Sequence, residues 1–175
     1  MLMMRCLKSQ LYSLAYAVKS SYKAVSLQEE IHDFAVYPLE GIWTKINGDY
    51  LDKAKLEYTI MIRQPDFISE EMVNEALGMV RIKKPNPLLE EIHFETMQNG
   101  LCVEVLHVGA FDDEPVSFEK MDQFSAAHGL RRSENYHREI YLSNANRVEK
   151  SKLKTILRYS VDRFLRGECN AHCRG

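Results

Sequence analysis

The chain has 175 residues, of which 45% are hydrophobic and 27% charged, an ordinary globular composition with enough length to bury a core. Lys and Arg number 23 and Asp and Glu 25, for a net charge of −2. Because the two signs are interspersed, the basic surface of a nucleic-acid-binding protein is not expected. The start is too polar for a signal peptide and no apolar run approaches a membrane span. The sequence therefore predicts a cytoplasmic protein with neither nucleic-acid nor membrane partners.

The first half of the chain predicts a helix, two strands and a second helix. Helical spacing of apolar residues indicates a helix at the start, with a face formed by Leu7, Leu11, Leu14, Ala15, Val18 and Tyr22. FAVYPLEGIWT (34–44) predicts a strand interrupted at Pro38 and Gly41, and LEYTIMIR (56–63) predicts a second strand. Residues 69–80 predict the next helix, with Ser69 as its N-cap. KKPNP (83–87) is expected to be a linker.

The second half predicts strands around one further helix. LEEIHFETM (89–97) and LCVEVLHVG (101–109) flank Asn99-Gly100, which is the strongest short hairpin signal in the chain. A helix is expected to begin near Pro115 and to end at Gly129. Two more predicted strands follow, YHREIYL (136–142) and LKTILRYSV (153–161).

The two halves resemble each other, which favours a duplicated helix–strand–strand unit. The first strand of each predicted pair carries Tyr-x-x-Glu followed by an aromatic residue: Tyr37, Glu40 and Trp43 in the first half, and Tyr136, Glu139 and Tyr141 in the second. The next strands also align, Thr59-Ile60-Met61 with Thr155-Ile156-Leu157. A duplication places a groove at the junction of the halves, where ligands commonly bind.

Glu139 is the leading candidate for a functional residue. Strand periodicity places His137, Glu139 and Tyr141 on one face. If that face is buried, the carboxylate needs a partner, and an aromatic cation lying on the rings would supply one. The same carboxylate could instead act as a general acid or base. The alternative is that this face is exposed to solvent.

The other candidates each have an ordinary structural explanation. Trp43 offers a flat stacking surface beside Glu40, but it is equally explained as a core residue with a capping Glu. Tyr58 and Met61 are candidate pocket residues that are usually core. A lone histidine such as His107, beside Val103 and Val105 in its strand, is more often a satisfied core residue than a catalyst.

Cofactor and metal chemistry is not expected. Cys102 is best explained as a small buried hydrophobe, and the tail ECNAHC offers only Cys169, His172 and Cys173, short of a zinc ligand set. No phosphate-binding glycine loop, paired metal ligands or serine elbow is present.

Taken in order, YPLEGIW, YTIMIRQPDF, CVEVLHVGAFDDEP, HREIYLSNANR and KLKTILRYSV resemble the GyrI-like small-molecule-binding family, especially its stand-alone branch. The likeness runs from about Leu11 to Val161. It implies an α+β fold of tandem strand–helix–strand–strand modules, with an antiparallel sheet, helices on one face and a ligand cleft between the halves. The implied arrangement is a single domain over 1–175: module one at about 5–66, helix and linker at 67–90, module two at about 91–162, and a tail at 163–175.

The resemblance also implies a function and a set of site residues. It carries the family's central glutamate onto Glu139, with Tyr141 beside it, and brings Glu40 and Trp43 into the same pocket. The first expectation is a module that binds lipophilic aromatic or cationic compounds. The second is a hydrolase of cyclopropane-bearing electrophiles, with Glu139 as general acid or base and Tyr141 as hydrogen-bond donor. The third is a protein-interaction domain of gyrase-inhibitor type.

The start of the chain departs from the family pattern, because the predicted first helix begins almost at the first residue. The first strand of module one is therefore expected to be missing. That would leave an unpaired sheet edge, which makes a homodimer plausible.

Overall fold

The computed structural model describes residues 2–4, 8–25, 33–44 and 57–164. It divides into two compact units, Met1–Gln98 and Asn99–Gly175, called here unit one and unit two. Each unit combines antiparallel strands with at least one α-helix, so the predicted α+β class and antiparallel pairing are confirmed. No helix in the described ranges is long and apolar enough to cross a membrane.

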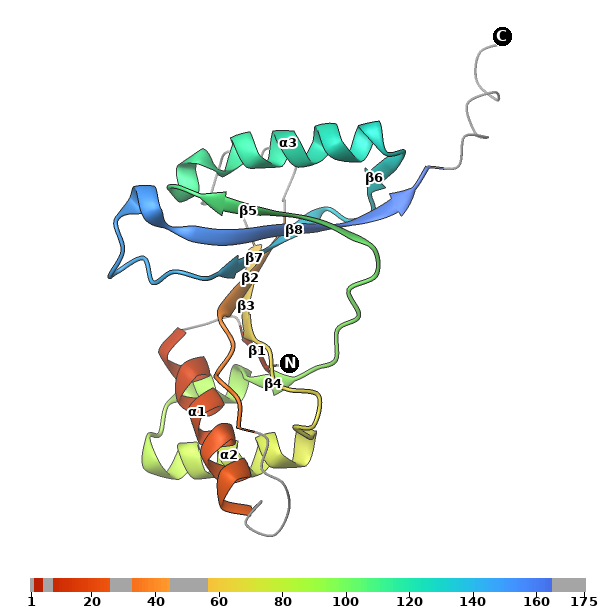
Figure 1. Ribbon diagram of the computed structural model, residues 1–175. Coiled ribbons are helices and arrows are strands. Elements are labelled where there is room, and N and C mark those ends of the chain that lie inside the picture. The colour runs from red at the N-terminus through yellow and green to blue at the C-terminus, as the bar shows by residue number, and fades with distance from the viewer. Residues whose placement is uncertain (1, 5–7, 26–32, 45–56, 165–175) are drawn as a thin grey trace. The chain divides into compact units, whose positions relative to one another are not determined.

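The described residues of unit one form four antiparallel strands and two α-helices (Figure 1). The strand order is β4 (His93–Phe94), β1 (Leu2–Met4), β3 (Glu57–Ile62) and β2 (Leu39–Thr44). Helix α1 (Lys8–Val25) packs on helix α2 (Glu70–Lys83), and α1 also contacts β3.

The helices of unit one form where the sequence patterns place them. The apolar face of α1 is fully buried, with at most 1% exposure at Leu11, Leu14, Ala15 and Val18. Helix α2 begins after Ser69, whose Oγ accepts a hydrogen bond from the Met72 N–H at 3.3 Å. Ser69 also hydrogen-bonds the exposed Glu71 carboxylate and so lowers its pKa. The predicted N-cap is confirmed.

The prediction that the first strand of module one is missing is wrong. Leu2–Met4 form β1, which pairs with Ile60–Ile62 of β3 on one side and with β4 on the other. Three residues are too few for a strand periodicity to stand out before the stronger helical pattern. The argument for a homodimer from an unpaired edge loses this basis, and the homodimer itself stays a prediction.

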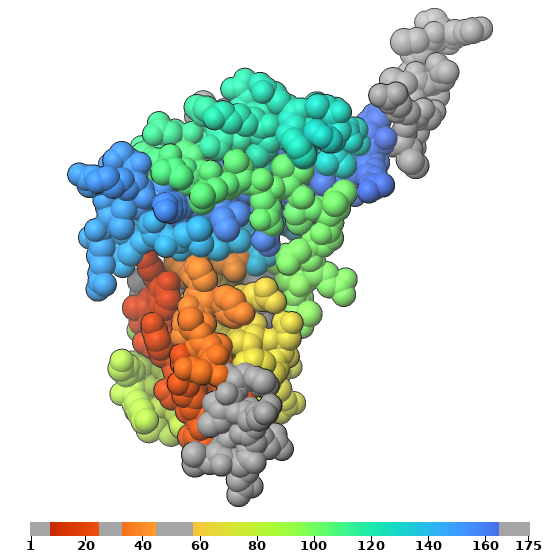
Figure 2. Space-filling model, viewed as in Figure 1, coloured from red at the N-terminus to blue at the C-terminus, as the bar shows by residue number. Residues whose placement is uncertain are grey.

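In unit two the described residues, up to 164, form a three-stranded antiparallel sheet with an added short strand and one α-helix (Figure 1). The central strand β8 (Lys154–Arg163) pairs with β7 (Tyr136–Tyr141) and with β5 (Cys102–Val108). Its far end pairs with β6 (Leu130–Arg132), which the sequence did not predict. Helix α3 (Glu114–Ala127) contacts β5 and β6. Its side chains form part of the surface of this unit in Figure 2.

The core of unit two lies between α3 and the sheet. Met121 of α3 packs among Val103, Leu157, Tyr159 and Val161, all at most 7% exposed. The helix ends as predicted at Gly129, whose φ of 65° is the left-handed conformation that glycine adopts readily. This apolar cluster packs α3 against the sheet.

The predicted hairpin at Asn99-Gly100 is wrong. Strand β4 pairs with β1 and strand β5 pairs with β8, so the segments flanking Asn99-Gly100 are not partners. Gly100 keeps the positive φ of a turn, 44°, but the chain there connects the two units. The strand predicted over 89–97 is also shorter than expected. A 3₁₀ helix, Pro87–Glu91, precedes β4, and the Asn86 side chain caps it by accepting from the Leu88 N–H at 2.9 Å.

Candidate functional site

Glu139 lies buried in β7 and has a histidine partner. Its exposure is 7% and that of His137 is 8%. His137 Nε2 lies 3.0 Å from Glu139 Oε1. The alternative of a solvent-exposed face is therefore excluded. Placing the two residues at i and i+2 of one strand is what brings the side chains together, because alternate residues share a face.

Register shows that Glu139 belongs to the face of the sheet that α3 covers. Glu139 lies opposite Leu157 and Tyr141 opposite Thr155. Leu157 is part of the core cluster with Met121 of α3, and both Leu157 and Thr155 are at most 1% exposed. Directly opposite residues of an antiparallel pair share one face, so the carboxylate points to the same side as that core.

Aromatic rings from α3 and from the turn before it contact His137 and Tyr141, the residues on either side of Glu139 on this strand face. The Phe118 ring of α3 meets the His137 imidazole edge-on, with 4.7 Å between ring centroids. Phe111, in the 3₁₀ turn Phe111–Asp113 before α3, meets Tyr141 edge-on at 6.0 Å. The arrangement is a buried carboxylate with a nitrogen donor on one oxygen, and the residues two positions before and after it in the strand each contact an aromatic ring. Chemically it can compensate a cation or accept a proton.

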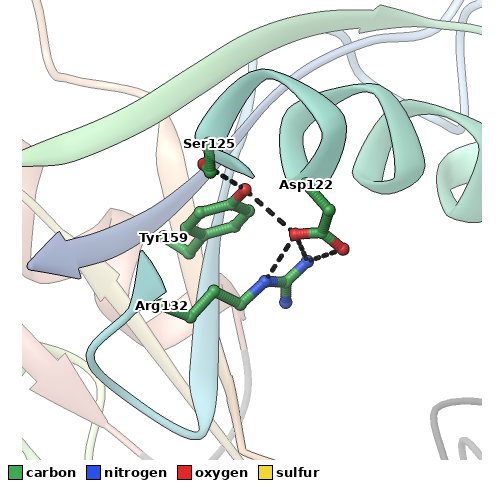
Figure 3. A network of polar contacts seen from close by, with 4 residues as sticks. All are labelled: Asp122, Ser125, Arg132 and Tyr159. Carbon is green, nitrogen blue, oxygen red and sulfur yellow. Dashed lines mark hydrogen bonds and ion pairs between the residues drawn. The ribbon is translucent and has the colours of Figure 1, made fainter. Parts of the chain in front are cut away.

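A polar network fixes α3 above this face (Figure 3). The Tyr159 hydroxyl of β8 donates to Asp122 Oδ1 at 3.0 Å and lies 3.0 Å from Ser125 Oγ, both on α3. Arg132 of β6 donates to the Asp122 carboxylate through Nε at 2.9 Å and Nη2 at 3.0 Å. The Arg132 guanidinium also lies over the Tyr159 ring, 4.0 Å from its centroid, and over Phe118 at 5.4 Å. The helix that carries Phe118 is thus tied to two strands.

Burial sets the ionisation of the tyrosine in this network. Desolvation raises the pKa of Tyr159, and the neighbouring Asp122 carboxylate raises it further, against lowering effects of Ser125 and Arg132. The phenol is therefore held in its neutral, donating form.

Unit one carries a carboxylate in the same register. Glu40 of β2 is 4% exposed and lies opposite Met61, just as Glu139 lies opposite Leu157. Ile42 lies opposite Thr59, just as Tyr141 lies opposite Thr155. The loose sequence alignment of the two halves is thus reproduced as an identical strand register.

The register separates Glu40 from Trp43. Three positions apart in a regular strand, the two side chains point to opposite faces of β2. Trp43 shares its face with Tyr58, directly opposite, with 5.3 Å between ring centroids and 32° between ring planes. Trp43 is half-buried and Tyr58 is 46% exposed. The expected pairing of Glu40 and Trp43 on one surface is corrected accordingly, and Met61 rather than Trp43 is the neighbour of Glu40.

His107 occupies a satisfied core position. It is 5% exposed, its Nδ1 lies 2.9 Å from Ser117 Oγ and its Nε2 lies 3.0 Å from the Ala110 carbonyl. Both ring nitrogens thus hold the turn between β5 and α3. Among the described residues, no three His, Cys, Asp or Glu side chains gather as a metal site. Cys169, His172 and Cys173 lie outside the described residues.

One family model matches most of the chain. The model of the GyrI-like small molecule binding domain matches residues 9–160. The chain belongs to this family. No curated protein sequence matches it.

Three solved structures resemble the GyrI-like domain of this chain over nearly its whole length. An uncharacterized conserved protein from Listeria innocua is 32% identical with a TM-score of 0.76. Two structures named as hydrolases from the same organism are 31% and 32% identical, with TM-scores of 0.78 and 0.81. In each case the match covers 92% of this chain and 86% of the other chain.

Sequence reasoning on this GyrI-like domain placed His137 on the face of Glu139 but did not assign it to the site, and it missed Phe118. His137 had a usable signal, because a histidine two residues before a buried glutamate in a strand shares its face. Phe118 had none, since its contact with His137 joins a helix to a strand across 19 residues of sequence.

Proposed function

We propose that the protein binds lipophilic aromatic cations, with the Glu139 carboxylate as counter-charge. The observation that carries the proposal is a buried carboxylate on the helix-covered face of unit two, whose partner His137 contacts the Phe118 ring and whose strand neighbour Tyr141 contacts the Phe111 ring. A buried carboxylate is costly unless it is compensated, and a cation beside aromatic rings compensates it well. The family supplies the general expectation of a small-molecule ligand. Glu40, in the equivalent register of unit one, is the second carboxylate assigned to ligand binding.

The direct test is a titration of a permanently cationic rhodamine ester, followed by fluorescence anisotropy, in wild type and Glu139→Gln. The glutamine keeps size and hydrogen-bonding capacity but removes the charge. A hydrogen-bonded charge contributes about 1.5–3 kcal/mol, so binding should weaken roughly 10- to 100-fold. Glu40→Gln, measured alongside, reports whether the second carboxylate contributes.

The chain offers a matched control for this substitution. Glu95 also follows a histidine at two positions, and His93 Nε2 lies 3.0 Å from Glu95 Oε1, but both side chains are more than half exposed. Glu95→Gln should bind the rhodamine as wild type does. Equal affinity in Glu139→Gln and wild type would contradict the role of counter-charge. Absence of rhodamine binding by wild type would contradict the ligand class.

A second candidate function is hydrolysis of cyclopropane-bearing electrophiles. It is favoured by the two similar structures named as hydrolases and by the His137–Glu139 pair, which is built like an acid–base couple. In this reaction Glu139 takes a proton from water while the water oxygen bonds to a ring carbon. The ring C–C bond breaks, and its electron pair passes to a conjugated carbonyl oxygen that the Tyr141 hydroxyl stabilises.

Chromatography of a cyclopropane-containing electrophile incubated with the protein distinguishes the two candidates. Turnover that disappears in Glu139→Gln and persists in Glu95→Gln supports the hydrolase. Binding of the rhodamine without turnover supports a binding protein alone.

A further inference from the structure

We infer that His137 determines the charge selectivity of the Glu139 site through its own protonation, an inference that rests on the proposed function. Neutral His137 leaves the site with the single negative charge of Glu139. Imidazolium at the same position cancels that charge. The site therefore accepts aromatic cations when His137 is neutral and loses its preference for them when His137 is protonated.

The geometry couples the two groups directly. His137 Nε2 lies 3.0 Å from Glu139 Oε1, so Nε2 carries the hydrogen that the carboxylate accepts. Both residues are at least nine-tenths buried, which limits screening by water and salt. The edge of Phe118, at 4.7 Å between centroids, keeps the imidazole in this orientation.

The size of the effect follows from Coulomb's law. A bound cation next to the carboxylate would lie about 6 Å from the imidazolium, and at an effective dielectric constant of about 20 the repulsion corresponds to roughly 10- to 100-fold in affinity. An uncharged aromatic molecule experiences no such repulsion. The inference therefore predicts pH dependence for cations alone.

The effect of His137 must be separated from that of other charged and titratable groups on the elements that form this face of unit two. Helix α3 contributes Glu114 and Asp122, strand β6 Arg132, strand β8 Tyr159, and strand β5 His107. Tyr141 lies on the same strand face as His137. Histidine is the side chain whose charge ordinarily changes between pH 5 and 8, so His107 is the only other member of this set that competes as the titrating group.

The experiment compares wild type, His137→Gln and His93→Gln at about pH 8 and about pH 5.5. Glutamine retains an N–H donor toward Glu139 but does not titrate. His93→Gln is the matched control, because the His93–Glu95 pair has the same spacing and the same 3.0 Å contact but is exposed. The probes are the cationic rhodamine ester and a neutral coumarin, both followed by fluorescence anisotropy.

Wild type and His93→Gln should bind the rhodamine roughly 10- to 100-fold more weakly at the lower pH, and His137→Gln should bind it equally at both. Coumarin affinity should not change with pH in any of them. The inference is overturned if rhodamine affinity still depends on pH in His137→Gln, which would point to His107. It is also overturned if rhodamine affinity does not depend on pH in wild type. In both cases the proposed function stands. Failure of wild type to bind rhodamine at pH 8 removes the proposed function itself.

A measurement on wild type alone covers the case in which His137→Gln does not fold. The inference links cation binding to proton loss from His137, so calorimetry between about pH 5.5 and about pH 8 in buffers of different ionisation enthalpy should show proton release with rhodamine and none with coumarin. Equal proton release with both probes, or none with rhodamine, overturns the inference.

Discussion

Removal of the Tyr159 hydroxyl should destabilise unit two by about 2 kcal/mol. In Tyr159→Phe the Asp122 carboxylate loses one donor, and the buried Ser125 Oγ loses the hydroxyl 3.0 Å away. A hydrogen bond to a charged acceptor contributes about 1.5–3 kcal/mol. Asp122 keeps the two donors of Arg132, so the lower part of that range applies.

Urea denaturation followed by circular dichroism measures this loss, and thermal denaturation should show a Tm lower by about 4–8 °C. The matched control is Tyr16→Phe, since Tyr16 is 59% exposed on α1. That control should change the free energy of unfolding by less than about 0.5 kcal/mol. If Tyr159→Phe is no less stable than Tyr16→Phe, the network in Figure 3 does not anchor α3.

The difference in unfolding free energy between wild type and Tyr159→Phe should change with pH in one direction. Because burial raises the pKa of Tyr159 above the ordinary 10.0, the folded state holds the phenol proton more tightly than the unfolded state. The stabilisation by Tyr159 is therefore complete below about pH 10 and is lost as the pH rises through the folded-state pKa. The stability difference between wild type and Tyr159→Phe should narrow above about pH 10. Burial also raises the pKa of Tyr12, but Tyr12 is present in both proteins, so its contribution to the stability difference cancels.

Two further predictions concern the core and a helix cap. Leu157 and Met61 occupy equivalent, fully buried register positions. Leu157→Ala and Met61→Ala should each lower the free energy of unfolding, measured by urea denaturation, by about 3 kcal/mol. A loss below about 1 kcal/mol at either position would show that the surrounding side chains collapse around the cavity. Ser69→Ala should cost about 1 kcal/mol, because the Met72 N–H loses its acceptor. The lowered pKa of Glu71 adds a contribution that is present above its unfolded pKa and lost as the pH falls through its folded pKa, so the Ser69→Ala deficit should shrink in acid. A deficit independent of pH would contradict the Ser69–Glu71 bond.

Local signals in the sequence were sufficient for elements that local contacts stabilise. Helix α2 begins where Ser69 can cap it and α3 ends where Gly129 can adopt a positive φ, so both boundaries were predictable. The Asn99-Gly100 signal correctly indicated a turn conformation, but the hairpin predicted from it does not form. Its two flanking segments pair with β1 and β8, and only the tertiary fold decides those partners.

The residues of the candidate site also divide into those that local sequence signals could predict and those that depend on the tertiary fold. Glu139 was predictable, because a carboxylate between apolar residues of a strand has to lie on a definite face. The contact of Phe118 with His137 depends on how α3 lies over the sheet, which no spacing within one segment specifies. The separation of Glu40 from Trp43 was in principle available from strand parity, since an odd spacing reverses the face.

The duplicated register also shows where the two halves have diverged chemically. Glu40 and Glu139 occupy equivalent positions, opposite Met61 and Leu157. The residue two positions before Glu139 is His137, whereas the residue two positions before Glu40 is Pro38, whose side chain has no hydrogen-bond donor and cannot titrate. At this strand position an imidazole precedes the carboxylate in unit two, and a proline precedes it in unit one. Charge selectivity that responds to pH should accordingly follow Glu139, and substitution of Glu40 should weaken cation binding to the same extent at pH 8 and pH 5.5.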